Sequence, residues 1–303
     1  MPLRDWMLLL LLSVLWGGSF FFVELAVGAL PAMTIVWLRV APAALLLALV
    51  LWARGLAWPR GWRVWAALAV MGLLNNALPF TLFVTAQARI DSGLAAILNA
   101  TTPLWALILG LVAGAEARPG MARLAGLGLG FGGVAVMLGG GATGTTSTLA
   151  AQLLCLGGAL SYACAGVWGR RFAPMGLSPL ATAFGQLAMA SLLLLPLMLY
   201  LDRPWQLALP GPSVLGALAG LTLLSTALAY LIYFRLLASV GAVNLLLVTF
   251  LIPVSALALG IGVLGEAPGV RALAGMALIG AGLAAIDGRL PAWLRRRMRP
   301  LAG

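Results

Sequence analysis

The chain has 303 residues, of which 63% are hydrophobic and 8% charged, and its mean hydropathy is +1.10. Soluble domains carry about 25% charged residues, so this composition excludes a soluble globular protein and predicts a polytopic membrane protein. All 18 basic residues are arginines and the net charge is +11. These charges lie at the ends of apolar segments rather than on a folded basic face, so we expect no nucleic-acid partner.

Ten apolar segments follow one another along the chain, each close to the ~20 residues that a transmembrane helix needs. The breaks between them are short and contain Gly or Pro. The first segment is too long for a signal peptide, so we expect it to be retained. The sequence therefore predicts an all-α polytopic membrane protein with ten transmembrane helices, at 6–27, 32–52, 63–86, 91–114, 121–139, 149–169, 178–201, 212–235, 240–264 and 269–287.

The second half of the chain repeats the first. The text from Leu73 to Ala117 aligns without a gap with that from Leu223 to Ala267, at an offset of 150 residues. Each copy holds five spans, and an odd number turns the second copy upside down in the bilayer, as in many transporters. We predict a first five-helix repeat at 1–138, a linker at 139–148, a second inverted five-helix repeat at 149–288 and a basic tail at 289–303.

Arginine counting predicts the orientation. With the N-terminus in the cytoplasm, 14 arginines face the cytoplasm and three face outside, which fits the positive-inside rule. We expect a multi-pass protein of the bacterial inner membrane with both termini in the cytoplasm. The arginines of the tail should anchor the last helix at anionic membrane lipid. Two paired halves can complete a pathway within one chain, so a functional monomer is the simpler expectation.

Several motifs of other protein classes are missing or misplaced. A Walker loop needs a lysine, and the chain has none. The string from Gly128 to Gly133 matches a dinucleotide fingerprint, but it lies mid-span without a preceding strand. We predict that Gly128 and Gly132 serve helix packing there. Without histidines, and with scattered acids, we expect no metal site, no cofactor and no enzyme activity.

Two ionisable residues lie inside predicted spans, where such groups are functional candidates. Glu24 and Arg39 should lie at similar depth and form an ion pair. This pair could be a latch between two spans, or an outer gate, proton site or substrate-charge site. An arginine partner would hold Glu24 ionised, which counts against proton transfer. Three further acids, Asp91, Glu116 and Glu266, should each cap the helix that follows it.

Polar and aromatic residues gather near two span-interior prolines. Each of Pro103 and Pro253 frees a carbonyl about one turn earlier, near the mid-bilayer depth where repeat transporters bind substrate. Asn75 and Asn76 lie mid-span, and Ser225 and Thr226 occupy the matching positions of the second copy. Any single aromatic residue could instead pack or face lipid. The candidate substrate-binding residues are Trp16, Asn76, Phe80, Asn99, Tyr162, Trp168, Tyr230, Asn244, Thr249 and Phe250.

An ordered set of motifs resembles the EamA-type branch of the drug/metabolite transporter superfamily. It comprises the Trp-Gly pair at Trp16, Arg39 after Pro31, and Pro103 followed by Glu116, with Pro253 and Glu266 repeating the last pair. The second half departs from the first at two positions. Tyr162 replaces Trp16 and Gln186 replaces Arg39, so only the first half can carry the ion pair.

The resemblance implies a basket of helices around a central cavity that moves metabolites by alternating access. Family members export amino acids and other metabolites, or exchange nucleotide sugars and organic phosphates. The chain is most similar to the bacterial amino acid exporters. The resemblance and the largely uncharged lining predict export of small amphipathic molecules, most simply aromatic or other neutral amino acids. A proton-coupled exporter of organic cations or drugs, and a non-transporting scaffold or lipid-handling protein, stay open as alternatives.

Overall fold

The computed structural model describes residues 2–112, 120–138, 146–245 and 247–287, and in these ranges the chain forms helices and no strand. The first half contains α1 (Leu3–Val27), α2 (Ala32–Ala53), α3 (Trp62–Gly72), η1 (Leu73–Ala77), α4 (Leu78–Gln87), α5 (Ser92–Asn99), α6 (Thr102–Val112) and α7 (Met121–Leu138). The second half contains α8 (Thr146–Gly169), α9 (Pro179–Leu197), η2 (Met198–Asp202), η3 (Pro204–Gln206), α10 (Pro212–Ala219), η4 (Gly220–Leu228), α11 (Ala229–Leu245), α12 (Val248–Leu259), η5 (Gly260–Leu264) and α13 (Val270–Asp287).

These elements join into the ten predicted spans. Within the described ranges, eight helices are long and apolar enough to cross a membrane, and two shorter apolar helices, Val248–Leu264 and Val270–Ile286, complete the set. The third span is assembled from α3, η1 and α4, and the fourth from α5 and α6. Spans 7, 8 and 9 are likewise built from consecutive helical pieces. The prediction of an all-α fold with two inverted five-helix repeats is confirmed.

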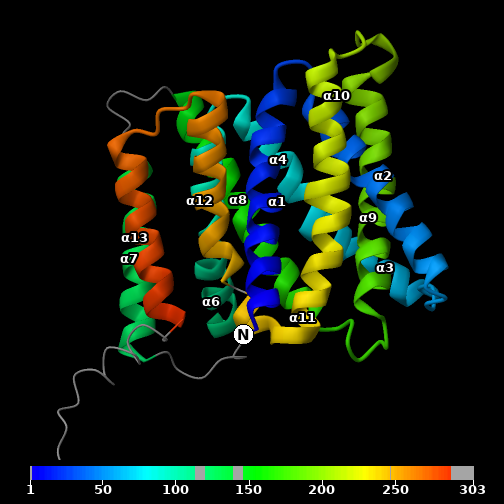
Figure 1. The fold of residues 1–303 in the computed structure, drawn as a ribbon, viewed down its shortest axis with the longest axis horizontal. Coiled ribbons are helices and arrows are strands. Elements are labelled where there is room, and N and C mark those ends of the chain that lie inside the picture. The colour runs from blue at the N-terminus through cyan, green and yellow to red at the C-terminus, as the bar shows by residue number, and fades with distance from the viewer. Residues whose placement is uncertain (1, 113–119, 139–145, 246, 288–303) are drawn as a thin grey trace, which may run out of the picture.

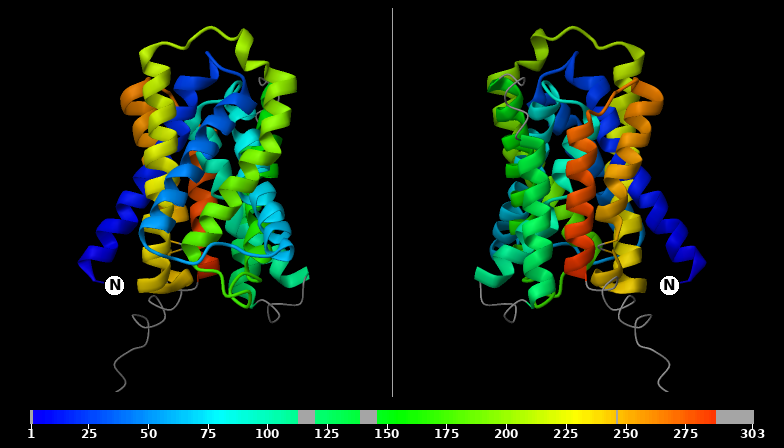
Figure 2. Two further views of the ribbon diagram at one scale, coloured as in Figure 1. Left: turned by 90° about the vertical axis from the view of Figure 1, so that its right-hand side faces the viewer. Right: turned by 90° about the vertical axis from the view of Figure 1, so that its left-hand side faces the viewer.

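Inversion is visible in the direction of the helices. The chain begins at one end of the bundle, which we call the N-terminal end, and α13 finishes at that same end (Figure 1). We call the opposite end, where α1 finishes, the far end. Because each repeat has five spans, α1 runs toward the far end while its counterpart α8 runs away from it. Figure 2 shows the same arrangement from two sides.

Charge is distributed unequally between the two ends. In the described ranges, the N-terminal end holds eight arginines, at positions 4, 54, 60, 63, 123, 170, 171 and 235, whereas the far end holds Arg89, Arg203 and Arg271. Four acids, Glu24, Asp91, Asp202 and Glu266, lie at or near the far end. The arginine bias predicted from the sequence is therefore present in three dimensions.

The main packing contacts of the two halves correspond to each other. Helix α1 packs against α12, and its repeat partner α8 packs against α5 and α6. Helices α2 and α9, themselves repeat partners, pack against each other, and so do α7 and α13 at one edge of the bundle (Figure 1). The halves are thus interleaved, and the core is shared between them.

Glycines allow the closest of these helix contacts. A Cβ on Gly17 in α1 would lie 2.9 Å from the backbone nitrogen of Ala256 in α12. Between α7 and α13, a Cβ on Gly126 or Gly133 would meet the carbonyl oxygen of Gly282 or Gly275 at 2.6 or 2.7 Å. Glycine therefore lets the helix backbones approach more closely than any larger residue would allow.

The glycines that the sequence analysis selected for packing are the wrong ones. A Cβ on Gly128 or Gly132 would meet nothing within 4 Å. Successive residues of an α-helix point about 100° apart, so glycines two residues away from the packed Gly126 and Gly130 lie on another face. Glycines of this segment do pack against another helix, but the spacing alone does not tell which of them face it.

Wide turns interrupt the third and eighth spans at matching places. Segments η1 and η4 are π-helical. Pro79 follows η1 and has no backbone N–H to donate to the carbonyl of Asn75, which favours a wider turn. In η4 the hydroxyl of Thr226 donates to the carbonyl of Leu221, five residues earlier, at 2.7 Å. Such bulges are frequent at functional sites, and both lie at the centre of this bundle.

Candidate functional site

The centre of the bundle contains one buried cation. Arg39 is 7% exposed and is the only buried arginine among the described residues. It lies seven residues after the start of α2, or roughly 10 Å along the helix axis. Its Nε donates to Thr226 Oγ1 in η4 at 3.0 Å, and its guanidinium carbon lies 3.7 Å from the centroid of the Phe80 ring. Arg39 therefore joins α2 and α4 of the first half to η4 of the second.

The expected ion pair between Glu24 and Arg39 is not formed in the described part of the chain. Glu24 Oε2 instead accepts from Gln87 Nε2 at 3.2 Å, and Gln87 also donates to the carbonyl of Phe20 at 2.8 Å. Glu24 sits close to the far end of α1, whereas the guanidinium of Arg39 points toward η4. The arginine is therefore left without a counter-ion from Glu24.

Next to Arg39, one hydroxyl gathers two amides from the other half. Tyr230 of α11 is 9% exposed, and its hydroxyl accepts from Asn76 Nδ2 at 3.1 Å and from Asn75 Nδ2 at 3.2 Å. Asn75 also donates to Gln186 Oε1 of α9 at 3.0 Å. Adjacent residues seldom reach one partner from an α-helix, so the π-turn of η1 is what brings both amides to this hydroxyl.

Aromatic rings enclose this polar cluster. The ring of Tyr162 in α8 lies 6.4 Å from that of Phe80 and is stacked on that of Phe83 at 6.1 Å. Tyr162 packs against both of the large apolar clusters that form the core. Trp16, its counterpart in the first half, lies 5.5 Å from the ring of Tyr233.

We define the central cluster as the buried and half-buried residues that these contacts join. It contains Arg39 and four of the ten expected substrate residues, Asn76, Phe80, Tyr162 and Tyr230. Its members are Arg39, Asn75, Asn76, Phe80, Tyr162, Gln186, Thr226 and Tyr230.

Two buried polar atoms, one in the central cluster and one on the residue before its member Thr226, have no hydrogen-bond partner. Asn76 is fully buried and its Oδ1 accepts nothing, and Ser225, which precedes Thr226, is 1% exposed with an unpaired hydroxyl. Leaving a buried polar atom unpaired costs about 1–3 kcal/mol. Polar groups in this position are therefore suited to bind a polar ligand or water between the halves.

Six of the expected substrate residues, Trp16 among them, lie outside the central cluster. The freed carbonyl of Asn99 accepts from the hydroxyl of Thr102 at 2.8 Å, so the Pro103 break satisfies itself locally. Trp168 lies near the end of α8, where its Nε1 donates to the carbonyl of Ala67 at 3.0 Å. Asn244 donates to the carbonyl of Val240 at 2.9 Å, and Thr249 and Phe250 occupy the first turn of α12.

Carboxylates from the second half cap helices of the first half at the far end. Glu266 Oε1 accepts from the backbone N–H and the hydroxyl of Ser92 at 3.0 and 2.6 Å, and its Oε2 accepts from the N–H of Gly93 at 3.1 Å. Asp202 Oδ2 accepts from the N–H and the hydroxyl of Thr34 at 2.7 and 2.8 Å. These caps tie the two halves together at this end.

The expected capping partners of the acids need correction. Glu266 caps α5 rather than α13, and Asp91 precedes α5 without making a side-chain cap bond. Burial, and then the nearby Glu266 carboxylate, raise the pKa of Asp91 above its usual value, which disfavours a second charged cap beside the first. Glu116 lies outside the described residues.

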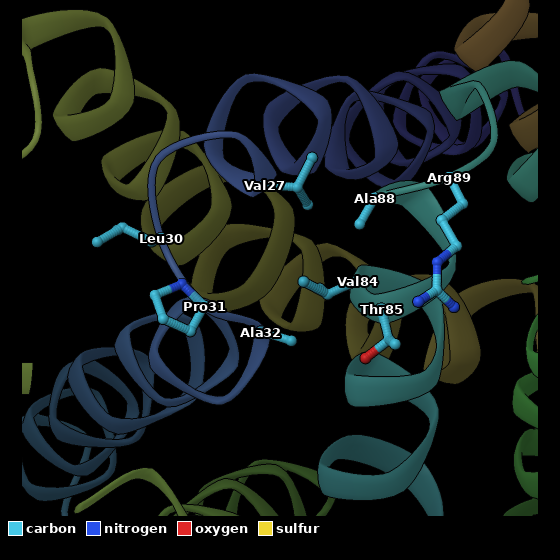
Figure 3. A pocket seen from close by; sticks show the side chains of 8 residues that line it. All are labelled: Val27, Leu30, Pro31, Ala32, Val84, Thr85, Ala88 and Arg89. Carbon is cyan, nitrogen blue, oxygen red and sulfur yellow. The ribbon is translucent and has the colours of Figure 1, made fainter. Parts of the chain in front are cut away.

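Two cavities lie in the described part of the bundle. One of about 210 Å³ lies at the far end, where α1 ends, α2 begins and α4 ends. Figure 3 shows Arg89 and Thr85 on its α4 side, with Val27, Leu30 and Pro31 opposite. The other, of about 320 Å³, lies between α6 and α8. It is lined by Leu74, Leu109, Val112, Cys164, Val167, Trp168 and Arg171.

No binding role is predicted from the sequence for three polar residues that join helices in the structure. Gln186 bonds to Asn75 and Asp202 bonds to Thr34, both across the two halves, and Gln87 joins α4 to α1 within the first half. Polar residues inside predicted spans are a signal for the two glutamines, because an unpaired amide is costly there. The sequence offers no comparable signal for the cap between Asp202 and Thr34.

The fold and this centre define a class: a polytopic membrane protein whose two inverted five-span repeats meet around a polar and aromatic cluster, the architecture of a secondary transporter. The profile of the EamA-like transporter family matches residues 5–139 and 149–286. The chain therefore belongs to the EamA-like transporter family, and it is a membrane transporter.

Similar proteins have the same general description. The chain is 27% identical over 265 residues to an uncharacterized transporter of Archaeoglobus fulgidus, covering 86% of this chain and 90% of that one. It is 29% identical over 257 residues to the uncharacterized inner membrane transporter YedA of Escherichia coli K12, covering 84% and 81%. A solved crystal structure shares the fold with a TM-score of 0.68 at 20% identity, over 98% of this chain and all of the other.

Proposed function

We propose that this protein exports small amphipathic metabolites, most simply aromatic and other neutral amino acids, by alternating access through the central cluster. The observation that carries the proposal is that amides, hydroxyls and aromatic rings from both repeats converge there, with Tyr230 joined to Asn75 and Asn76. Hydrogen-bonding groups beside aromatic faces suit a molecule with a polar end and an apolar side chain.

The two ends of the bundle support an alternating pathway. A cavity whose lining includes Arg171 at the N-terminal end also touches Leu74, the residue before Asn75 of the central cluster. At the far end, Glu266 and Asp202 hold the halves together, and opening that end would break these bonds. The arginine bias favours a cytoplasmic N-terminal end, so the proposal places loading on the cytoplasmic side of the inner membrane and release outside. It assigns no cofactor and no enzymatic step.

The experiment is transport by the purified protein in liposomes of phosphatidylethanolamine and phosphatidylglycerol. Labelled phenylalanine, leucine, serine and lysine are loaded inside or outside, with and without a pH gradient. We expect saturable flux of phenylalanine and leucine above that of protein-free liposomes. If every amino acid stays at the level of the protein-free control, the amino acid proposal is wrong.

A proton-coupled exporter of organic cations is the second candidate. One observation favours it: Glu24 is bonded to the neutral Gln87 rather than to Arg39, so no arginine holds this carboxyl ionised. The pH-gradient arm of the experiment separates the candidates when ethidium is added as a probe. Ethidium flux that depends on the gradient and is lost in Glu24→Gln would favour the second candidate.

A further inference from the structure

The charge of Arg39 is not neutralised by the protein around it. A guanidinium has five N–H donors, and in the described part of the chain the only hydrogen bond from Arg39 runs from Nε to Thr226. One face of the guanidinium lies on the Phe80 ring. No carboxylate of the described residues lies within ion-pair distance of it, and Glu24 bonds to Gln87 instead.

An arginine that served only to hold α2 in place should have a carboxylate partner. A buried charge without a counter-ion costs several kcal/mol, and inside a membrane such residues mark binding sites or ion pathways. The aromatic contact offsets only about 0.5–2 kcal/mol of that cost. The two terminal amino groups of Arg39, which form the edge that pairs with carboxylates side by side, remain available.

Residues near Arg39 in the fold have unpaired oxygen atoms that can accept hydrogen bonds from a cation. Asn76 Oδ1 and Ser225 Oγ are buried and unpaired. The Asn76 amide donates to the hydroxyl of Tyr230. Tyr230 lies one helical turn beyond Thr226, and Thr226 accepts the hydrogen bond from Arg39. A cationic edge and the uncharged oxygen of Asn76 therefore lie within one cluster, and Ser225 is the residue before its member Thr226. Such groups match the carboxylate and ammonium groups of a zwitterion.

We propose that Arg39 is the binding site for a carboxylate of the transported molecule, with Asn76 and Ser225 accepting its ammonium group. This inference rests on the proposed function and narrows it. The substrates are small carboxylates with an apolar side chain, and amines that lack a carboxylate are excluded. The cation remains buried without a protein partner because the substrate supplies the counter-ion.

Competition tests this assignment. Flux of labelled phenylalanine into proteoliposomes is measured against increasing 3-phenylpropionate, which lacks the amine, and phenylalaninamide, which lacks the carboxylate. For the wild-type protein we expect inhibition by 3-phenylpropionate and little by phenylalaninamide. In Arg39→Gln we expect the half-inhibitory concentration of 3-phenylpropionate to rise roughly 10- to 100-fold, the loss of a charge-assisted bond. Arg39→Lys should fall in between, because a point charge replaces a planar fork.

A matched control and a second measurement complete the test. Arg271→Gln removes one positive charge from an exposed position at the far end and should behave as the wild type. Thermal unfolding in detergent, with and without 3-phenylpropionate, measures binding without transport. Ligand should stabilise the wild type but not Arg39→Gln, while Arg39→Gln without ligand should be at least as stable as the wild type.

Each outcome decides separately on the inference and on the proposed function. If the wild type carries phenylalanine and Arg39→Gln keeps the wild-type response to both competitors, the inference is overturned and the function stands. If no amino acid is carried but 3-phenylpropionate stabilises the protein only when Arg39 is present, the function fails and the inference stands. Transport of phenylalaninamide alone overturns both. Should Arg39→Gln not fold, an unchanged half-inhibitory concentration in Arg39→Lys overturns the inference.

Discussion

The two repeats meet at the centre through equivalent helices but bring different chemistry to it. Arg39 in α2 of the first half donates to Thr226 in η4. Gln186 in α9 of the second half accepts from Asn75 in η1. The first half supplies Phe80 where the second supplies Tyr230. Inverted duplication thus fixes the geometry of the contacts, while the charge belongs to one half and the phenolic hydroxyl to the other.

The largest effect is expected where helices of the two halves cross. A Cβ on Gly72 would lie 2.5 Å from the carbonyl oxygen of Gln186 and 2.9 Å from the nitrogen of Ala190, whereas its repeat partner Thr222 donates to the carbonyl of Leu38 at 2.9 Å. Gly72→Ala should force α3 from α9 and cost about 3 kcal/mol. Thr222→Ala should lose about 0.6 kcal/mol. Thermal unfolding in detergent measures both, and equal losses would show that the two crossings are not different.

The unequal aromatic pair gives the next largest effect. Tyr230→Phe makes this position like Phe80 and removes the acceptor of two amides. Because Asn76 would then be buried without a partner, we expect a loss of about 1–2 kcal/mol in stability and a higher KM for phenylalanine. The exposed Tyr200 provides the matched control, Tyr200→Phe. A Tyr230→Phe protein with wild-type stability and KM would contradict the role given to the hydroxyl.

The two acids beside α5 should respond differently. Glu266→Gln has one acceptor oxygen where the carboxylate has two, so the caps on Ser92 and Gly93 cannot both persist, at a cost of about 1 kcal/mol. Asp91→Asn should cost nothing at neutral pH, because it makes no cap bond and burial raises its pKa.

The raised pKa of Asp91 also predicts the direction in which the stability of the protein changes with pH. An acid with a higher pKa in the folded state contributes stability at low pH that is lost as the pH rises through that pKa. This decline should disappear in Asp91→Asn and persist in Glu266→Gln in a weaker form, since Glu266 is the second cause of the shift. Unfolding midpoints measured across the pH range would refute this if Asp91→Asn kept the full decline.

The smallest effect is expected at Trp168, which lies outside the central cluster. Trp168→Phe loses the bond to the carbonyl of Ala67, worth about 0.6 kcal/mol, and should change the KM for phenylalanine by less than about twofold. A larger change in KM would place this tryptophan in the substrate path and enlarge the site toward the N-terminal end.

Much of the fold could be predicted because it depends on features that can be read along the sequence. The ten spans follow from hydropathy, and the inversion follows from five spans per repeat. The repeat alignment also paired Asn76 with Thr226 and Phe80 with Tyr230, and all four lie in the central cluster. Residues that share a depth in both copies meet at the pseudo-symmetry axis, so alignment alone identified this part of the centre.

The remainder depends on which way each side chain points. Equal depth suggested an ion pair between Glu24 and Arg39, but the side chains point to different helices. Prolines directed attention to Asn99 and Thr249, although the Asn99 carbonyl is satisfied by its neighbour Thr102. Caps between the halves, such as Asp202 on Thr34, join residues far apart in sequence. Spacing gives the depth of a residue in a helix, but only packing fixes its direction.

The wide turn of η1 has a consequence for how this centre can change. It holds one residue more than an α-helical turn would need, so the amides of Asn75 and Asn76 reach the same hydroxyl. Substitutions can alter the amides but not the residue count. Deleting a single residue there would turn the wide turn into an ordinary α-helical one, in which adjacent side chains point about 100° apart and the two amides no longer reach one hydroxyl. A change in the number of residues in η1 should therefore disrupt the contact between the two halves more than a change of side chain.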